Sequence, residues 1–156
     1  MTNNPSPPDD TDAVRSHYDK TARKYDRQIS LFERILFGGG REWVCAQAHG
    51  DVLEIAAGTG RNLRHYPPSV RLTTIELSPS MLEIAWREAA ALGRDADQRI
   101  GDAQALEFPD HSFDTVICTL GLCTIPDEGA AVREAKRVLH PGGRFVLLEH
   151  VRSPLR

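Results

Sequence analysis

A glycine turn after the first strongly apolar stretch is the earliest point at which the sequence indicates chemistry. Residues 54–62 read EIAAGTGRN. Gly58 and Gly60 allow a tight turn and let a ligand approach bare backbone. A GxG turn is also an ordinary structural turn, so its surroundings must decide. A dinucleotide-binding turn would carry a third glycine for a pyrophosphate, but Leu63 stands at that position, which favours a nucleoside ligand without phosphates.

Two carboxylates follow at the ends of the next two apolar segments. Glu76 lies near the end of the segment 70–77, where it is suited to accept hydrogen bonds from both hydroxyls of a ribose. The alternative is a solvated charge at a strand end. Asp102 ends the segment 98–102 and either accepts from an adenine amino group or forms an Asx turn. The spacing alone leaves this second choice open.

These groups must be positioned by apolar segments that alternate with helical ones. Such alternation predicts βαβ units, and right-handed crossovers then give an α/β fold with a doubly wound, mainly parallel sheet. Ligands of such sheets bind at the carboxyl ends of the strands, which is where the glycine turn and both carboxylates fall. The expected strands are 51–57, 70–77, 98–102, 113–120 and 144–151, and the expected helices between them are 61–66, 79–92 and 127–139.

The chain before the sheet divides into two parts. Residues 1–12 are polar, acidic and rich in proline, so a disordered tail is predicted. Residues 13–49 have helical periodicity, and residues 50–156 form the ligand-binding domain. Tyr18 and Tyr25 lie seven positions apart on one helix face. They either pack against the domain or form a lid over its ligand, and the spacing does not choose between the two.

Length, composition and net charge further restrict the class of protein to which the chain can belong. A chain of 156 residues with 40% hydrophobic and 26% charged residues is expected to form one globular domain. The net charge of −3 leaves no electrostatic footprint for nucleic acid. No apolar run reaches the roughly 18 residues of a membrane span. The three cysteines form no CxxC pair, so neither a disulfide framework nor a metal site is expected, and the cytoplasm is the predicted location.

Taken together, the motifs resemble those of class I S-adenosylmethionine-dependent methyltransferases, in particular their type 11 domain. The resemblance runs from about Asp51 to Val151. It is carried by VLEIAAGTGRNL, TIELSPSML, GDAQALEFPDHSFDTVIC and RVLHPGGRFVLLEH. It implies a Rossmann-like sheet of order 3-2-1-4-5 without the usual sixth and seventh strands. It also implies S-adenosyl-L-methionine as cofactor and S-adenosyl-L-homocysteine as its product.

The resemblance also assigns roles to residues. It implies that Glu54 orients the glycine loop, that Glu76 holds the ribose, and that Asp102 with Ala103 holds the adenine. Ala56 stands where the family usually has glycine, and we expect only a small adjustment for its methyl group. The full set of implied cofactor-binding residues is Tyr18, Tyr25, Glu54, Ala56, Gly58, Thr59, Gly60, Asn62, Glu76, Leu77, Met81, Asp102, Ala103, Cys118, Thr119 and Leu120.

A finer resemblance concerns the methyl acceptor. YPPSVRLTTIELSPSML and CTLGLCTIP are similar to a subgroup with membrane-associated thiol S-methyltransferases and bacterial phospholipid or quinone methyltransferases. It implies a small, apolar acceptor: a thiol, a quinone or phenol, or an amine. The animal members carry an N-terminal membrane anchor, and we expect none here. No catalytic residue is identified; His150, near the end of the last strand, is either a general base or a structural residue.

Two alternatives to an active methyltransferase remain. Because part of the usual acceptor side is not seen, the chain is alternatively a cofactor-binding module with little or no turnover. A nicotinamide-dependent oxidoreductase is disfavoured by Leu63. The last predicted strand, FVLLEHV, would lie unpaired at the sheet edge, which favours association of two copies through it.

Overall fold

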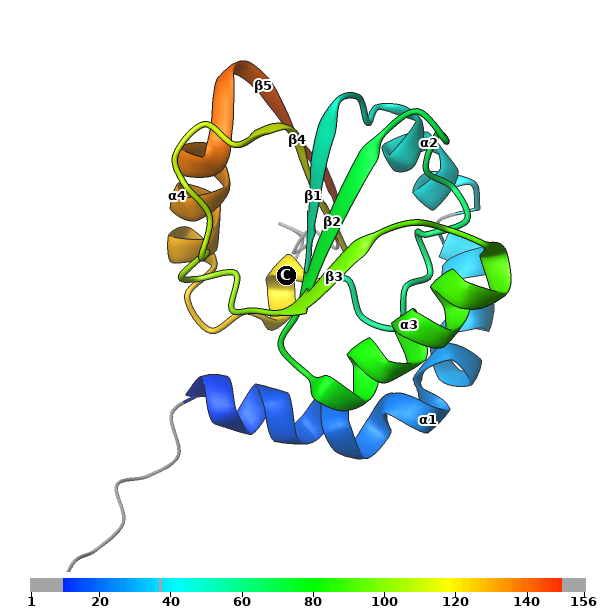
Figure 1. The fold of residues 1–156 in the computed structure, drawn as a ribbon. Coiled ribbons are helices and arrows are strands. Elements are labelled where there is room, and N and C mark those ends of the chain that lie inside the picture. The colour runs from blue at the N-terminus through cyan, green and yellow to red at the C-terminus, as the bar shows by residue number, and fades with distance from the viewer. Residues whose placement is uncertain (1–9, 37, 150–156) are drawn as a thin grey trace, which may run out of the picture.

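The computed structural model describes residues 10–36 and 38–149, without the side chains of residue 28 and residues 30–36 (Figure 1). A five-stranded parallel sheet of order β3-β2-β1-β4-β5 carries helices on both faces, which confirms the predicted fold class and strand order. The strands are β1 (Asp51–Ile55), β2 (Arg71–Glu76), β3 (Asp97–Ile100), β4 (Phe113–Thr119) and β5 (Leu139–Leu148). The helices are α1 (Asp10–Leu36), α2 (Gly40–Ala46), α3 (Pro79–Leu92), the short 3-10 helix η1 (Leu122–Thr124) and α4 (Glu128–Val138).

The two central strands are buried on both faces. Successive residues of a strand point to opposite sides, so Val52 faces the core beneath α2 and α3 while Leu53 faces the core beneath α4. Ile117 and Val116 of β4 divide in the same way. All four side chains are fully buried. This double burial explains why these strands appear in the sequence as continuous apolar runs instead of alternating ones.

Local signals set the ends of α3 and α4, which lie within one residue of the expected bounds 79–92 and 127–139. The Ser78 hydroxyl accepts from the Met81 backbone N–H at 3.2 Å and caps α3. Gly93 ends α3 in the left-handed conformation, with φ of 61°. The Asp127 carboxylate accepts from the Ala130 N–H at 2.8 Å and caps α4.

The helix predicted over residues 61–66 is wrong, because this segment is a series of turns. The Leu63 N–H bonds to the Gly60 carbonyl at 3.0 Å and the His65 N–H to the Asn62 carbonyl at 2.9 Å, which are the three-residue steps of turns. Pro67 follows directly and disfavours helical backbone at the residue before it.

The last strand begins earlier than predicted. β5 starts at Leu139, directly after α4, and includes the Pro-Gly-Gly sequence at 141–143, which precedes the expected strand 144–151. Phe113 pairs with Leu139 and Thr115 with Arg144, so the four residues between those two partners bulge out of the ladder. The predicted end of the strand at 150–151 lies outside the described residues.

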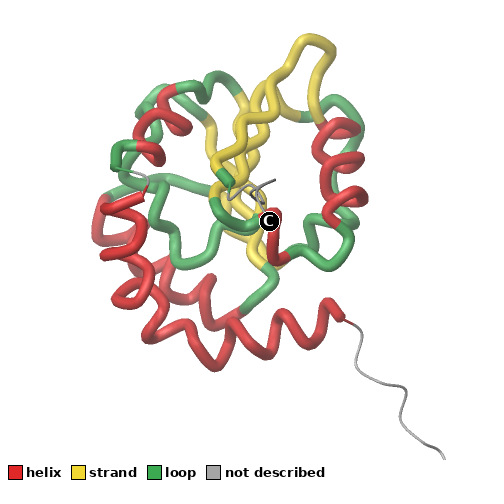
Figure 2. Tube along the Cα trace, turned by 180° about the vertical axis from the view of Figure 1, so that it is seen from behind, coloured by secondary structure: helices red, strands yellow, loops and turns green. Residues whose placement is uncertain are grey.

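The N-terminal helix runs across the carboxyl ends of the strands (Figure 1), and the view from behind shows it below the loops that follow them (Figure 2). It begins at Asp10, so it includes the end of the predicted tail; residues 1–9 lie outside the described part. Asp19 fixes α1 to α3, since its carboxylate accepts from the Ser78 hydroxyl at 2.5 Å and the Ser80 N–H at 3.2 Å. Among the described helices, none combines the length and apolar character needed to cross a membrane.

Candidate functional site

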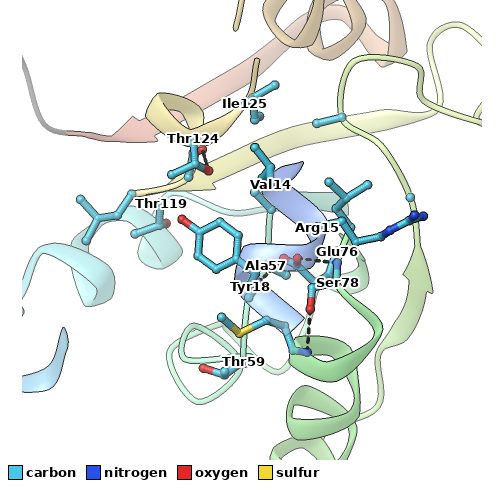
Figure 3. A pocket seen from close by; sticks show the side chains of 18 of the residues that line it. Val14, Arg15, Tyr18, Ala57, Thr59, Glu76, Ser78, Thr119, Thr124 and Ile125 are labelled. Carbon is cyan, nitrogen blue, oxygen red and sulfur yellow. Dashed lines mark hydrogen bonds between the residues drawn. The ribbon is translucent and has the colours of Figure 1, made fainter. Parts of the chain in front are cut away.

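A pocket of about 800 Å³, including its open mouth, lies between α1 and the carboxyl ends of β1 to β4 (Figure 3). It is located where a doubly wound sheet binds its ligands. The predicted site residues that line it are Tyr18, Tyr25, Ala56, Gly58, Thr59, Glu76, Leu77, Met81, Asp102, Ala103, Thr119 and Leu120. Four other predicted residues, Glu54, Gly60, Asn62 and Cys118, do not line it and lie behind its wall.

The two glycines of the turn serve different purposes. Both have left-handed backbone, with φ of 60° at Gly58 and 81° at Gly60. A Cβ at Gly58 would meet no protein atom within 4 Å, so this stretch of the pocket wall is bare backbone open to a ligand. A Cβ at Gly60 would lie 2.6 Å from Leu63 Cδ1 and 3.2 Å from Ala85 Cα. Gly60 therefore allows the turn to pack closely against α3.

Ala56 has a backbone conformation that is unfavourable for an alanine. Its φ is 53°, in the left-handed region that disfavours any residue with a Cβ by about 1–2 kcal/mol. Gly121 passes beside it, and a Cβ there would lie 2.8 Å from the Ala56 Cβ. Glycine at 121 thus leaves room for the Ala56 methyl group.

Glu76 holds a fixed carboxylate at the end of β2. Only 6% of the residue is exposed. Its Oε2 accepts from the Gly58 N–H at 2.7 Å and its Oε1 from the Ser78 N–H at 2.9 Å. Burial raises the pKa of the carboxyl group, and the backbone N–H donors oppose that rise. The glycine turn and the start of α3 together orient this carboxylate at the pocket wall.

A buried polar cluster lies behind the wall where β1 and β4 end. The Asn62 side-chain amide donates to Glu54 Oε1 at 2.8 Å and to Thr119 Oγ1 at 2.9 Å. The Tyr66 hydroxyl donates to Glu54 Oε2 at 2.9 Å. Asn62 is fully buried, so in this structure it supports Thr119 and the turn from behind instead of facing the pocket.

Glu54 supplies the carboxyl group of this cluster, and its pKa is strongly raised. Burial raises its pKa to about 7, although the Tyr66 hydroxyl and the charge of Arg41 act in the opposite direction. Arg41, in the first turn of α2, donates through Nη1 to Asn62 Oδ1 at 2.9 Å. Glu54 contacts the turn through the Asn62 side chain, and the orienting role that the resemblance implies stays a prediction.

At the other end of the pocket, Asp102 forms the Asx turn that the sequence left open. Its Oδ1 accepts from the Gln104 backbone N–H at 2.8 Å and from the Gln104 side-chain amide at 3.0 Å. Gln104 in turn accepts from the Asp127 N–H at 2.9 Å. Asp102 and Ala103 nevertheless line the pocket, as does the buried Met81.

The two tyrosines of α1 form part of the pocket wall. Their ring centroids lie 6.0 Å apart in an edge-to-face arrangement, and both rings line the pocket. Tyr18 directs its hydroxyl toward Thr119 and Thr124 (Figure 3), and burial raises its pKa. This placement favours the lid interpretation over simple packing against the domain.

The cysteines carry no reactive thiolate in the pocket. Cys118 is fully buried, its Sγ lies 3.6 Å from Glu149 Oε1, and burial raises its pKa well above the ordinary value. It therefore behaves as a small apolar residue. No group of His, Cys, Asp or Glu side chains suited to a metal ion occurs in the described parts of the chain. The candidate base His150 lies outside them.

Sequence reasoning missed several pocket residues, most of which lie within the quoted motifs at positions to which no role was assigned. One of them, Arg41 of α2, lines both this pocket and a second hollow on the α2 and α3 side of the glycine turn, as Arg61 also does. Its only sequence signal is its place directly after the glycines at 38–40. The other missed residues are Val14, Arg15, Ala57, Arg61, Ser78, Gly101, Gln104, Gly121, Thr124, Ile125 and Pro126.

Comparison with known proteins identifies the sheet as a recurrent domain. A family model described as a methyltransferase domain matches residues 53–147. Human thiol S-methyltransferase TMT1A is 33% identical over 130 residues, covering 81% of this chain. The demethylmenaquinone methyltransferase of Deinococcus radiodurans is 36% identical over 148 residues, covering 88% of this chain. The chain spans 53% and 60% of the lengths of these two relatives.

Solved structures give the same result. A SAM-dependent methyltransferase from Thermotoga maritima aligns with a TM-score of 0.62 at 26% identity. The alignment covers 83% of this chain and 58% of that one. The fold therefore recurs in a protein that is 26% identical to this chain.

Proposed function

The chain belongs to the methyltransferase domain family, and on that premise we propose that it transfers a methyl group from S-adenosyl-L-methionine to a small acceptor. The observation that carries this proposal is the Glu76 carboxylate. It is buried, faces the pocket and is held by the N–H groups of Gly58 and Ser78. A carboxylate so fixed accepts from both hydroxyls of a ribose without reorganising.

The other two parts of the cofactor fit at the ends of different strands. The adenine fits between Met81 and the Asp102 turn, after β2 and β3. The methionine end fits over the bare backbone at Gly58 and beside Thr119, after β1 and β4. A pocket wall without a Cβ at Gly58 is the cradle that such a ligand needs, and the residues present therefore fit the group.

The cofactor, when bound, supplies the methyl group activated by its positive sulfur. The protein contributes alignment of acceptor and methyl group, a contribution worth roughly 7–11 kcal/mol in favourable cases. The Asn62 amide fixes Thr119, and Tyr18 covers the same end of the pocket from α1. These groups hold the reacting end in place and keep water out.

We propose a small apolar acceptor: a thiol, a quinone or phenol, or an amine. Support comes from the relatives named as a thiol S-methyltransferase and a demethylmenaquinone methyltransferase. It also comes from the apolar side chains that border the pocket near Tyr18, which are Val14, Leu120 and Ile125. A thiol acceptor needs little help from a base, because a thiol with pKa ~8.5 is partly ionised at neutral pH. An amine or a quinone carbon makes a base more important, and His150 stays the candidate for it.

The first experiment is calorimetric titration of the purified chain with S-adenosyl-L-homocysteine, with NADH as the comparison ligand. Binding of the first and not of the second supports the proposal, and the reverse pattern supports an oxidoreductase instead. Glu76→Gln keeps the shape of the side chain and removes its charge, so the affinity for S-adenosyl-L-homocysteine is expected to fall. Glu83→Gln, on the exposed face of α3, is the matched control.

The second experiment is a methyl-transfer assay with thiol, quinone and amine panels. Turnover with one class assigns the acceptor. Binding of S-adenosyl-L-homocysteine without turnover by any panel member supports the alternative, a cofactor-binding module with little or no activity.

Two further proposals concern partners and location. Within the described residues β5 is an edge strand, and its Leu147 is 40% exposed, which favours pairing of two copies edge to edge. Light scattering across a range of concentrations tests this, and a monomer at every concentration would exclude it. We expect no nucleic acid partner, which titration with duplex DNA tests, and a cytoplasmic location, which cell fractionation tests.

A further inference from the structure

We propose that Arg41, on α2, binds the carboxylate at the amino acid end of the cofactor; this inference rests on the proposed function. S-adenosyl-L-methionine ends in an amino acid whose carboxylate is charged at neutral pH. Burying a carboxylate is costly unless a charged or strongly polar group pairs with it. A guanidinium matches a carboxylate in both charge and shape and donates from two nitrogens at once.

The position of Arg41 follows from a chain of two hydrogen bonds. Its Nη1 donates to Asn62 Oδ1 at 2.9 Å, and the Asn62 amide donates to Thr119 Oγ1 at 2.9 Å. Thr119 ends β4, so Arg41 lies on the side of the pocket formed by β1 and β4. The Glu76 carboxylate, which we assign to the ribose, ends β2, and the Asp102 turn follows β3. Both lie on the opposite side of the pocket. Arg41 is thus at the end assigned to the methionine part.

The guanidinium is held firmly at this place. Val44 and Cys45 of the same short helix are fully buried in the core beneath α2 and α3. Asn62, which orients the guanidinium, is fully buried and is itself fixed by Glu54. Side chains held in this way lose little freedom when a ligand binds, which favours affinity.

Two other arginines line the pocket, and their contacts differ from those of Arg41. Arg15 pairs with Asp12 at 2.7 Å on the exposed face of α1. Arg61 lies 3.4 Å from the Asp26 carboxylate, which also accepts from the Thr59 hydroxyl at 2.6 Å. Both therefore have an acidic partner within α1. Arg41 donates through Nη1 to the amide oxygen of Asn62, which connects it to Thr119 on the β1 and β4 side of the pocket. Its guanidinium has five N–H donors, enough to serve Asn62 and a ligand carboxylate together.

The test compares two ligands that differ only in the carboxylate. S-adenosyl-L-homocysteine carries it, and S-adenosyl-3-thiopropylamine, its decarboxylated analogue, does not. Calorimetry or fluorescence gives the dissociation constant of each ligand for wild type, Arg41→Gln, Arg41→Lys and Arg61→Gln. Arg64→Gln is the matched control, because Arg64 lies in the neighbouring hollow, pairs with Glu88 and does not line the pocket.

For wild type we expect S-adenosyl-L-homocysteine to bind roughly 10- to 100-fold more tightly than the analogue, the usual value of a charged hydrogen-bonded contact. In Arg41→Gln this preference is expected to fall to about twofold or less while the affinity for the analogue stays nearly unchanged. Arg41→Lys is expected to retain part of it, and Arg64→Gln all of it.

The outcomes separate this inference from the proposed function. If wild type binds S-adenosyl-L-homocysteine but Arg41→Gln weakens both ligands equally, Arg41 has only a structural role and the inference is wrong. It is equally wrong if the preference persists in Arg41→Gln or is lost in Arg61→Gln instead. If wild type binds neither ligand, the proposed function itself is wrong, and this inference with it.

Discussion

Replacing Glu54 by glutamine should change how the stability of the protein depends on pH. Burial raises the pKa of Glu54 from 4.5 to about 7 in the folded protein. Between these two values the folded state retains a proton that the unfolded state releases. The free energy of unfolding therefore falls as the pH rises through this window. Glutamine does not ionise, so the Glu54→Gln variant lacks this contribution.

The size of the effect follows from the shift. A change of one pKa unit corresponds to about 1.4 kcal/mol, so the wild type should lose roughly 2–3 kcal/mol more than Glu54→Gln between pH 5 and pH 8. The two hydrogen bonds of the side chain survive the replacement. The glutamine oxygen accepts from the Asn62 amide, and the Tyr66 hydroxyl accepts from the glutamine amide after rotating.

The assay is urea unfolding of both proteins at a series of pH values from 5 to 8. The informative quantity is the difference in the free energy of unfolding between them, because contributions of other groups cancel. Glu83→Gln, on the exposed face of α3, is the control for the same substitution outside the buried cluster. A pH-independent difference between wild type and Glu54→Gln would refute a raised pKa at Glu54.

Four further substitutions test the turn and the thiols. Ala56→Gly should raise the free energy of unfolding by about 0.5–1 kcal/mol in denaturant unfolding, because relief of left-handed strain exceeds the entropy cost of glycine; unchanged or lower stability would contradict this. Gly60→Ala should destabilise by more than ~2 kcal/mol, because its Cβ would clash with neighbouring atoms. Gly58→Ala should cost only about 1 kcal/mol of backbone strain, yet it should measurably weaken the binding of S-adenosyl-L-homocysteine. Equal losses of stability in Gly58→Ala and Gly60→Ala would argue against separate roles for the two glycines. Cys123 should be the first thiol that a disulfide reagent labels in the native protein, since the other two cysteines are buried, and Cys123→Ser should abolish this fast labelling.

Much of the fold was predictable from local patterns. Buried parallel strands produce apolar runs, and cap residues such as Ser78, Gly93 and Asp127 mark helix ends through contacts within a few positions. Such signals act over short distances along the chain. They failed at residues 61–66, where side chains are drawn into a buried cluster with partners on other elements, and turns form in place of a helix.

The choice between alternatives for single residues needed the tertiary structure. Tyr18 and Tyr25 fitted packing and a lid equally well by spacing, and only the position of α1 across the strand ends brings them into the pocket. Asp102 fitted an adenine contact and an Asx turn, and the structure has the turn at the pocket wall. Asn62 was expected to face a ligand but is buried behind the wall.

The sequence by itself predicted the parallel sheet, because buried parallel strands produce apolar runs, and the resemblance of its motifs implied the strand order. It did not contain the charge and hydrogen-bond environment of the pocket. Arg41 and Asn62 are 21 residues apart, and Asn62 and Thr119 are 57 apart, yet they form one connected cluster. Packing of α2 beneath the turn brings them together. The pKa of Glu54 and the orientation of Arg41 are consequences of that packing, which no local pattern records.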